Sequence, residues 1–594
     1  MLKNRIIDDE ELEKPFDKEQ FKRLMGYMKP YGKQVIITLI LMMVAAVCGL
    51  LGPYFLQVAI DNYIEVADYK GLTIITLLFL ATNLINMVCM KQRVYIMSSV
   101  GQKILYRIRQ DLFEHIQTLS FTFYDSRPAG KILVRIINDV NSLGDLITNG
   151  IINVLTDVFT LIIAIVIMAY IDARLTLVTL STVPLLLLLV GLLKRRIRQR
   201  WQEVRKKSSN MNAYLHENLA GMRVTQAFVR QRETRNLYNE LSGDIFTTWM
   251  HAIRLNNLFW PGIELIAALG IALVYIFGMK FLDTGTVTVG VLVAFTGYVW
   301  RIWQPINNLA NFYNSLLVAM ASTERIFELL DTKPDIKDQA DAYELPEIKG
   351  EVRFENLEFY YDPEKPVLKH VDFTVKPGET IALVGPTGAG KSTIVNLISR
   401  FYDPVNGRVL IDGHDIKEVT LDSLRRQMGV MLQDSFIFSG TIMDNIRYGK
   451  LDATDEEVMN AARAVHAHEF ITQMEKGYYT EVNERGSKLS QGQKQLISFA
   501  RALLADPRIL ILDEATSSID TQTEILVQKG LERLLKGRTS FVIAHRLSTI
   551  RNADRIMVVD QGTIIESGSH EELLEKKGAY YNLYKAQYKY LNAV

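Results

Sequence analysis

Long uncharged apolar runs in the first half of the chain constrain its fold more than any other feature. Residues 35 to 56 contain no charged side chain, and about 20 apolar residues suffice to cross a bilayer as a helix. Further apolar runs cover residues 72 to 90, 151 to 171, 175 to 193, 258 to 279 and 287 to 310. We therefore expect six membrane-spanning helices. The third and fourth form one hairpin and the fifth and sixth another, because only short connections join them.

Basic residues predict how these spans are oriented. Residues 194 to 207 read KRRIRQRWQEVRKK, and loops rich in Lys and Arg stay on the cytoplasmic side. The connection between the second and third spans is also basic, whereas the connections on the opposite side carry few cations. We expect a multi-pass plasma-membrane protein with both termini in the cytoplasm. Apolar residues recur at helical spacing in the two cytoplasmic loops, which predicts helical extensions below the bilayer.

The second half of the chain has a different texture. From about residue 345, short β-rich runs alternate with helical stretches, a pattern typical of a soluble α/β domain with a mostly parallel sheet. The net charge of the whole chain is +1, so its charge balance does not indicate a nucleic-acid partner.

A phosphate-binding loop is predicted at residues 385 to 392, GPTGAGKS, between an apolar strand and a helix. Its glycines, Gly385, Gly388 and Gly390, let successive backbone N–H groups point at phosphate oxygens. Lys391 supplies a cation and Ser392 a magnesium ligand. The predicted nucleotide contacts also include Thr387 and Thr393.

An acidic residue at the end of an apolar strand also supports a nucleotide site. The apolar run from residue 509 to 512 ends in Asp513, and a strand of this kind presents its carboxylate to magnesium. The next residue is Glu514. Because it is adjacent to Asp513, its side chain is expected to point in a different direction from that of Asp513, and it is predicted to act as the general base that polarises a water for attack on the γ-phosphate.

The sequence Leu489-Ser-Gln-Gly-Gln493, taken with these motifs, resembles the signature of the ATP-binding cassette (ABC) family. Six spans before one cassette resemble a half-size exporter, and residues 123 to 140 are similar to the first cytoplasmic loop of that family. The resemblance implies an α-helical six-span transmembrane domain fused to an α/β phosphate-loop nucleotide-binding domain. The expected limits are a cytoplasmic segment with an elbow helix at 1–33, the transmembrane domain at 34–325, a linker at 326–345 and the cassette at 346–594.

The resemblance implies further residue roles for ATP and Mg²⁺. Tyr361 would stack on adenine, with neighbouring Tyr360 as the alternative. Gln433 would contact magnesium, and His545 would hold the γ-phosphate and the attacking water. The signature would complete the ATP site of a partner cassette through the residues Ser490, Gly492 and Gln493.

One departure from the family pattern bears on the partner. Gln491 stands where the family has its first signature glycine, and a side chain there should crowd the approach to the partner's γ-phosphate. Asp513, Glu514 and His545 are nevertheless intact in this chain. The combination resembles the catalytically competent subunit of bacterial heterodimeric multidrug exporters, although a homodimer that tolerates Gln491 remains open.

Polar and aromatic residues in the spans are candidates for substrate contact, because charges there are costly and tend to face a cavity or a partner. The candidates are Asp157, Glu264, Trp260, Tyr298 and Trp300. The alternative is that the aromatic residues form an interfacial belt or pack between helices, and that the acids lie near water at helix ends.

The function expected from these features is ATP-driven export of small amphipathic compounds, of the multidrug type, by alternating access. The protein would act as one subunit of a dimer with a second half-transporter. A homodimeric lipid or peptide exporter is the alternative, and a channel or receptor gated by the cassette is a second. The apolar runs exclude a soluble cassette ATPase.

Overall fold

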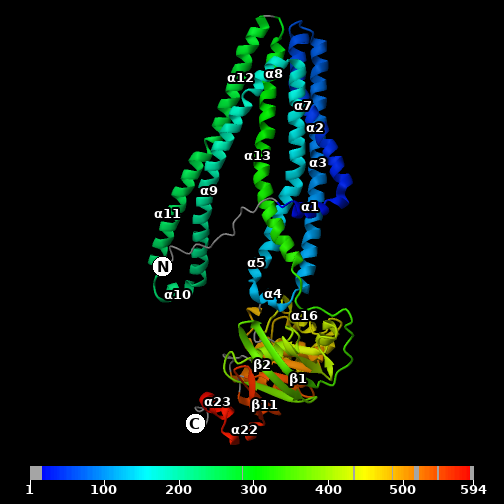
Figure 1. The fold of residues 1–594 in the computed structure, drawn as a ribbon, viewed down its shortest axis with the longest axis vertical. Helices are drawn as coiled ribbons and strands as arrows, with labels where there is room; N and C mark the ends of the chain where they lie inside the picture. The colour runs from blue at the N-terminus through cyan, green and yellow to red at the C-terminus, as the bar shows by residue number, and fades with distance from the viewer. Residues whose placement is uncertain are drawn as a thin grey trace. The chain divides into compact units, whose positions relative to one another are not determined.

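The chain divides into a helical unit and a mixed α/β unit. The computed structural model describes residues 17–283, 285–431, 435–483, 486–513, 521–544 and 547–588. The helical unit comprises residues 1–117 and 129–332, and the mixed unit comprises residues 118–128 and 333–594. Figure 1 shows the helices and strands of both units.

The helical unit consists of long helices joined by short turns. Its α-helices are α1 (Lys18–Gly26), α2 (Gly32–Val58), α3 (Tyr69–Thr118), α5 (Ala129–Val134), α6 (Val140–Asp145), α7 (Ile151–Ile171), α8 (Ala173–Leu180), α9 (Val183–Ala220), α10 (Met222–Ala227), α11 (Gln231–Asn256), α12 (Phe259–Asp283) and α13 (Val289–Asp331). Short 3-10 or π turns between them are η2 (Lys29–Tyr31), η3 (Ala59–Ile64), η4 (Arg135–Asp139) and η5 (Leu146–Gly150).

Five helical segments among the described residues are long and apolar enough to cross a membrane. They are Lys29–Ile64, Tyr69–Thr118, Ala129–Ile171, Ala173–Ala220 and Gln231–Asp283. The sixth expected span lies in α13, which contains Arg301 and Gln304 and does not reach the same hydropathy. The predicted helical extensions are confirmed, because α3 and α9 continue far beyond their apolar runs without a break.

The helical unit packs around α13. This helix contacts α2, α7 and α12, and the core between them includes the buried side chains of Leu50, Phe295 and Ile302. Gly297 of α13 lies against Pro53 of α2, where a Cβ would come within 3.1 Å of the proline ring. The small residue therefore allows α2 and α13 to approach closely.

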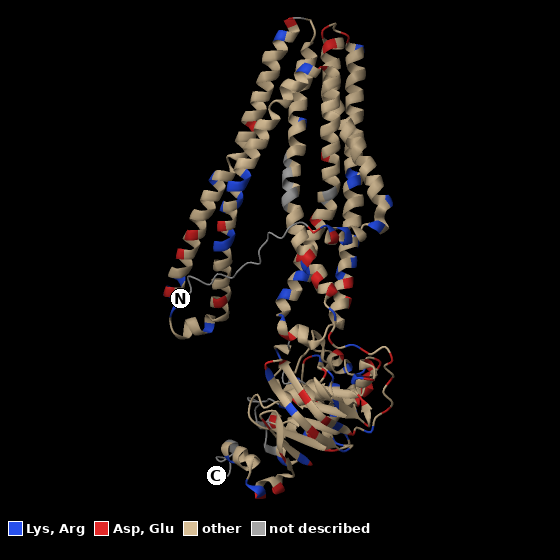
Figure 2. Ribbon diagram, viewed as in Figure 1, with Lys and Arg blue, Asp and Glu red and all other residues tan. Residues whose placement is uncertain are grey.

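Helices α9 and α11 form a second pair that runs side by side, with α10 closing its end (Figure 1). Figure 2 shows charged residues along both helices of this pair near α10, whereas charged residues are sparse along the upper parts of the long helices. Large apolar side chains such as Ile36, Leu77 and Leu188 are exposed on the uncharged parts. Exposed apolar surface of this extent suits contact with lipid.

A buried ion pair stabilises the helical unit where α13 meets η4. Asp139 is only 5% exposed. Its carboxylate accepts hydrogen bonds from Arg325 Nη2 at 2.6 Å, from Arg325 Nε at 3.0 Å and from Ser322 Oγ at 2.9 Å. The bidentate arrangement is the strong form of an Arg–carboxylate contact.

The mixed unit contains three sheets and several short helices. Its strands are β1 (Val352–Asp362), β2 (Lys365–Val375), β3 (Thr380–Val384), β4 (Asn406–Ile411), β5 (His414–Asp415), β6 (Met428–Met431), β7 (Gly440–Thr441), β8 (Glu481–Val482), β9 (Ile509–Asp513), β10 (Thr539–Ile543), β11 (Arg555–Asp560) and β12 (Thr563–Gly568). Its helices are α4 (Phe121–Ser126), α14 (Lys391–Ile398), α15 (Leu421–Arg426), α16 (Ile442–Arg447), α17 (Asp455–Ala464), α18 (His468–Thr472), η6 (Gly477–Tyr479), α19 (Gln491–Ala505), α20 (Thr521–Leu535), α21 (Leu547–Arg551), α22 (His570–Lys576) and α23 (Ala579–Tyr588).

The central sheet is mostly parallel, as predicted. Its strand order is β12-β11-β3-β10-β9-β6, with antiparallel pairing only between β11 and β12. Successive residues of β3 point to opposite faces: Ile381 and Leu383 join one apolar core, and Ala382 and Val384 join the other. A strand buried on both faces reads as a continuous apolar run, which explains the sequence of these strands.

The short helix α4 packs on the mixed unit although it follows α3 in the chain. The ring of Phe121 lies 4.3 Å from that of Phe401, between ring centroids. The hydroxyl of Tyr402 donates to the Asp125 carboxylate, and Ser120 Oγ donates to Asp335 at 3.1 Å. Burial, together with the hydrogen bond to Asp125, raises the pKa of Tyr402. The loop that leaves α3 is therefore anchored to the mixed unit.

Replacing Arg325 by Ala is expected to destabilise the helical unit by about 3 kcal/mol, because it leaves the Asp139 carboxylate buried without its ion-pair partner. Thermal unfolding in detergent measures the effect. Asp331→Asn is the matched control, since it breaks an ion pair with Arg23 whose side chains are 43% and 60% exposed and should cost about 1 kcal/mol at most. Equal losses in the two variants would contradict the prediction.

Candidate functional site

The candidate site is built on one edge of the central sheet. Strands β3, β10 and β9 are parallel neighbours, so their carboxyl ends lie at the same edge. The predicted phosphate loop leaves β3 there, and Asp513 is the last residue of β9. Parallel α/β sheets bind ligands at this edge.

Glycines shape the loop between β3 and α14. Gly385 has φ +147°, and a Cβ at this position would lie 2.1 Å from the carbonyl oxygen of Val559. Gly388 and Gly390 have φ +83° and +108°, in a region that side chains rarely adopt. Thr387 is exposed. The loop thus presents its backbone to an incoming ligand, with the N-terminus of α14 behind it.

Lys391 begins α14 and folds back over the loop. Its ammonium donates to the carbonyl oxygens of Gly385 at 2.8 Å and Pro386 at 2.9 Å. Burial lowers the pKa of Lys391, and the negative charge of Asp513 acts in the opposite direction. The Asp513 carboxylate is therefore close enough to act on the Lys391 charge at the sheet edge, and a cation beside a carboxylate suits phosphate and a divalent metal ion.

The remaining predicted chemistry lies next to this edge in sequence. Gln433 follows β6, Glu514 follows Asp513, and His545 comes two residues after the last residue of β10. All three lie outside the described residues, so their roles stay predictions. Ser392 is exposed at the first turn of α14, whereas Thr393 is buried.

Tyr361 lies beside the loop. Its hydroxyl is 3.3 Å from Oγ1 of Thr393 in α14, and its ring meets the ring of Tyr402 edge to face. The side chain is 51% exposed, whereas Tyr360 is half-buried. Tyr361 therefore has the free ring surface that stacking on a base requires.

The predicted signature forms the start of α19. Ser490 is its N-cap: Ser490 Oγ accepts a hydrogen bond from the Gln493 backbone N–H at 3.3 Å, and Gln493 Oε1 accepts one from the Ser490 N–H at 3.0 Å. This capping box fixes the helix N-terminus, where phosphate binds well. Gly492 is buried. Gln491 is the first helical residue and is half-buried.

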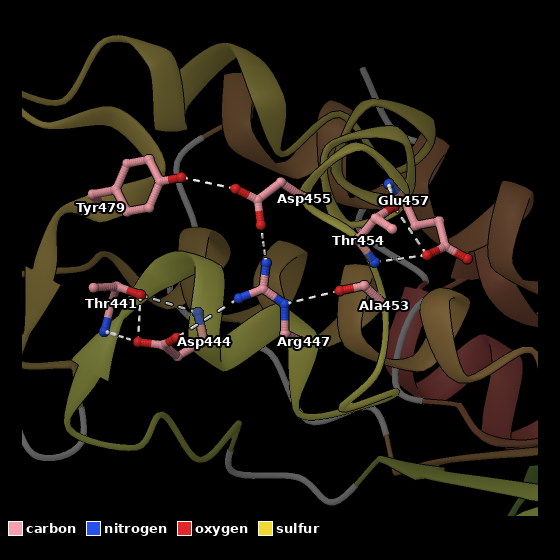
Figure 3. A network of polar contacts seen from close by, with 8 residues as sticks. All are labelled: Thr441, Asp444, Arg447, Ala453, Thr454, Asp455, Glu457 and Tyr479. Carbon is pink, nitrogen blue, oxygen red and sulfur yellow. Dashed lines mark hydrogen bonds and ion pairs between the residues drawn. The ribbon is translucent and has the colours of Figure 1, made fainter.

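A polar network holds the helices around α19 (Figure 3). Arg447 of α16 donates to the Ala453 carbonyl at 3.1 Å and pairs with Asp455 at the start of α17. The hydroxyl of Tyr479 donates to the same carboxylate at 2.8 Å. Since α16 and α17 both contact α19, the network positions the signature helix.

Capping boxes begin both of these helices, at Thr441 with Asp444 and at Thr454 with Glu457. The Thr454 backbone N–H donates to Glu457, and this contact, assisted by Lys450, lowers the pKa of Glu457 to about 2. The carboxylate is therefore ionised at neutral pH and keeps the start of α17 capped.

The five predicted substrate residues lie in three helices of the helical unit. Tyr298 is fully buried and its hydroxyl donates to the Leu50 carbonyl at 3.0 Å, so it takes part in helix packing. Asp157 accepts a hydrogen bond from Asn308 at 3.3 Å. Trp260, Glu264 and Trp300 are exposed. The described contacts do not join these residues into one site.

The sequence analysis did not single out Arg301, the residue after Trp300. It lines a cavity of about 640 Å³ between α2, α3 and α13. The available signal was a lone cation inside the sixth apolar run. The sequence analysis also did not predict that α4 packs beside Phe401 and Tyr402, because no local sequence pattern indicates that contact.

Comparison with protein families agrees with both halves of the fold. Residues 35–302 match the family model described as "ABC transporter transmembrane region", and residues 368–517 match the one described as "ABC transporter". A solved structure, "Structure of a bacterial Atm1-family ABC exporter with ATP bound", superimposes with a TM-score of 0.77 at 30% identity. That match covers 93% of this chain and 98% of the other.

Curated bacterial relatives match along most of the chain. "Uncharacterized ABC transporter ATP-binding protein YknV" of Bacillus subtilis is 47% identical over 98% of this chain and 96% of the relative. "Putative multidrug export ATP-binding/permease protein YgaD" of the same species is 39% identical over 95% and 99%. "Fatty acid ABC transporter ATP-binding/permease protein" of Mycobacterium bovis is 41% identical over 82% and 76%.

Gly385→Ala is expected to abolish ATP binding, because the new methyl group would collide with the Val559 carbonyl and displace the loop. Gly378→Ala is the matched control: Gly378 has φ +77°, but no heavy atom lies within 4 Å of a Cβ there. The control should cost only the backbone strain of about 1 to 2 kcal/mol. Binding of a fluorescent ATP analogue and thermal unfolding separate the two. Unchanged nucleotide affinity in Gly385→Ala would refute the collision.

Proposed function

We propose, because this chain belongs to the ABC transporter family, that it couples MgATP hydrolysis to export of amphipathic compounds across the plasma membrane, with both termini in the cytoplasm. Members of the family are ATP-hydrolysing transporters, and its exporters work as dimers in the bilayer. One observation carries the proposal: a unit of bilayer-length helices is fused to a cassette whose phosphate loop and Asp513 share one sheet edge. The multidrug character rests on the relative named for multidrug export.

At the phosphates, the loop amides and the N-terminus of α14 bind oxygen atoms. The Lys391 ammonium exchanges its two carbonyl partners for phosphate oxygens and neutralises charge there. Tyr361 stacks on the adenine ring. These steps explain why the loop must be rich in glycine and why a half-buried cation lies at its base.

The residues at the sheet edge fit a magnesium ion. Ser392 offers an exposed hydroxyl and Asp513 a carboxylate close enough to Lys391 to affect its titration, and oxygen ligands are those that magnesium prefers. Ser392, Asp513 and Gln433 would hold the metal ion. When bound, magnesium supplies positive charge that offsets the charge developing on the phosphates.

Hydrolysis is assigned to Glu514 and His545. Glu514 takes a proton from the attacking water as general base, and His545 orients the γ-phosphate end of the site. The partner's signature residues complete the site, as Ser490, Gly492 and Gln493 of this chain do for the partner.

Alternating access follows from the loops between spans. In the first cytoplasmic loop, α4 is anchored to the cassette through the contacts of Phe121 and Asp125, so movement of the cassette pulls on α3. In the second, α10 lies between α9 and α11 and would serve the partner cassette in the same way. ATP binding closes the cassettes, and hydrolysis resets the spans.

Glu514→Gln is expected to retain ATP binding and to lose at least 100-fold in ATP turnover, the loss typical of removing a general base. In liposomes, MgATP-driven dye transport should disappear with it. The neighbouring exposed residue Glu524, changed to Gln, is a control that should leave both activities intact. Normal ATP hydrolysis by Glu514→Gln would show that Glu514 is not the general base. Dye flux without ATP in the wild type would favour a channel over an exporter.

The partner is proposed to be a different half-transporter. Gln491 supports this, because a long side chain at the start of α19 would crowd the γ-phosphate of the partner's ATP. The partner would then carry an intact signature and complete the site of this chain. A homodimeric exporter of lipids or peptides is the alternative, and it is favoured by one observation: Gln491 occupies ordinary helical backbone, without positive φ.

Purified alone, the chain is expected to show only background ATPase activity, and adding its copurifying partner should raise the rate at least tenfold. Gln491→Gly should increase the ATPase activity of the chain alone, because it restores a usable signature in a homodimer. High activity of the wild-type chain alone, unchanged by Gln491→Gly, would establish the homodimer instead.

A further inference from the structure

The cavity between α2, α3 and α13 has the chemistry of a binding site. Its volume is about 640 Å³, within the range of pockets that hold drug-sized ligands. Phe55, Leu56 and Phe79 form an apolar wall, and Trp300, Arg301 and Gln304 supply its polar side. All of these residues belong to the helical unit.

Among the described residues, Arg301 is the only charged one that lines this cavity, and α2 makes room for it. A Cβ on Gly49 would lie 3.2 Å from Arg301 Nη1, and one on Gly52 would lie 3.4 Å from Nη2. The guanidinium therefore rests against a glycine-lined strip of α2. Larger residues at these two positions would push it out of the cavity.

Within the described part of the chain, Arg301 forms no ion pair and donates no hydrogen bond. Asp61 of η3 and Asp157 of α7 carry carboxylates, and each accepts a hydrogen bond from another residue, although Oδ2 of Asp157 has no hydrogen-bond partner among the described residues. Asp61 accepts from Thr288 Oγ1 at 2.6 Å and from the Gly290 backbone N–H at 2.8 Å, and Asp157 accepts from Asn308. An arginine inside a span without a carboxylate partner is costly, which favours a functional role.

We propose that this cavity binds an amphiphile with one anionic headgroup and an apolar tail, and that such compounds are among the substrates. Arg301 binds the headgroup, since a guanidinium matches carboxylate and phosphate oxygens in a bidentate manner. Gln304 adds an amide donor beside it, and the wall of Phe55, Leu56 and Phe79 takes the tail. The substrate class rests on the proposed export function, whereas binding itself does not.

The charge of the ligand follows from the lining. No acid is found among the described residues that line the cavity, so a cationic amphiphile would meet the like charge of Arg301 and no counter-ion from them. We therefore expect this cavity to prefer anionic over cationic ligands, the opposite of a cation-selective multidrug site. An anion at Arg301 neutralises a charge that the protein otherwise leaves unpaired.

Equilibrium binding to the purified complex in nanodiscs, without nucleotide, tests the proposal. The probes are radiolabelled oleate, oleylamine, oleyl alcohol and an oleoyl lysophosphatidate, which share a tail and differ in headgroup. Oleate should bind at least tenfold more tightly than oleylamine, and Arg301→Gln should remove that preference. The lysophosphatidate separates a phosphate headgroup from a carboxylate one: tighter binding than oleate assigns the site to lysophospholipids, and weaker binding assigns it to fatty-acid-like anions.

Two variants control for folding and for the tail. Arg93→Gln removes an arginine of α3 that donates to Asn153 at 2.8 Å and is not among the residues that line the cavity, and it should leave oleate binding unchanged. Leu56→Trp narrows the cavity without changing its charge and should weaken all four probes. Arg301→Lys should keep most of the anion preference, which also answers the case in which Arg301→Gln fails to assemble.

Equal oleate affinity in wild type and Arg301→Gln would overturn the proposal. Dissociation of the dimer by Arg301→Gln, with Arg301→Lys intact, would instead assign Arg301 to a partner carboxylate and would also overturn it. MgATP-driven oleate flux in liposomes is measured separately. Oleate binding without flux would keep the site and reject the substrate class, whereas dye flux without oleate binding would keep the export function and reject the site.

Discussion

Parallel pairing of β3, β10 and β9 is the constraint on which the chemistry of this protein depends. It places the carboxyl ends of these three strands at one edge, and under the proposed function Lys391 and Asp513, more than a hundred residues apart in sequence, would act on the same ligand there. Burial of the strands on both faces makes that edge rigid. The loop glycines then need only bend the backbone toward the phosphates, because the sheet has already fixed where the loop begins and where α14 starts.

The same mixed unit also holds the first connection to the membrane helices. The segment at residues 118–128 packs with the cassette, although α3 before it and α5 after it belong to the helical unit. Aromatic stacking on Phe401 and the hydrogen bond between Tyr402 and Asp125 anchor this segment close to Tyr361, whose ring touches that of Tyr402. Tyr361, the residue proposed to stack on adenine, and the anchored loop are therefore separated by a single aromatic side chain. A change at Tyr361 could therefore reach α4 through the ring of Tyr402.

Features that depend on a local pattern were predictable from the sequence. The apolar runs, the phosphate loop and the acid at the end of β9 follow from composition and spacing alone, and the structure confirms the elements that carry them. Features that depend on packing were not. The sequence offers Tyr298 for substrate contact or for helix packing and does not show that its hydroxyl donates to the Leu50 carbonyl, and the Tyr402–Asp125 contact joins residues 277 positions apart. Arg301 becomes informative only in the structure, where the described residues around it include no counter-ion. Gln433, Glu514 and His545 lie outside the described residues, so the sequence remains their only support.

The contacts of Lys391 with Gly385 and Pro386 have a consequence for the resting cassette. A half-buried ammonium with no acceptor would attract small anions, and such an anion would compete with nucleotide. Here the loop offers its own carbonyl oxygens as placeholders. When a ligand binds, Lys391 then exchanges its hydrogen bonds to the two carbonyl oxygens for hydrogen bonds to the ligand, and it is not left without an acceptor before binding. Under the proposed function, a ligand that opens the loop would have to replace both carbonyl contacts of Lys391, and this requirement would disfavour weakly binding anions.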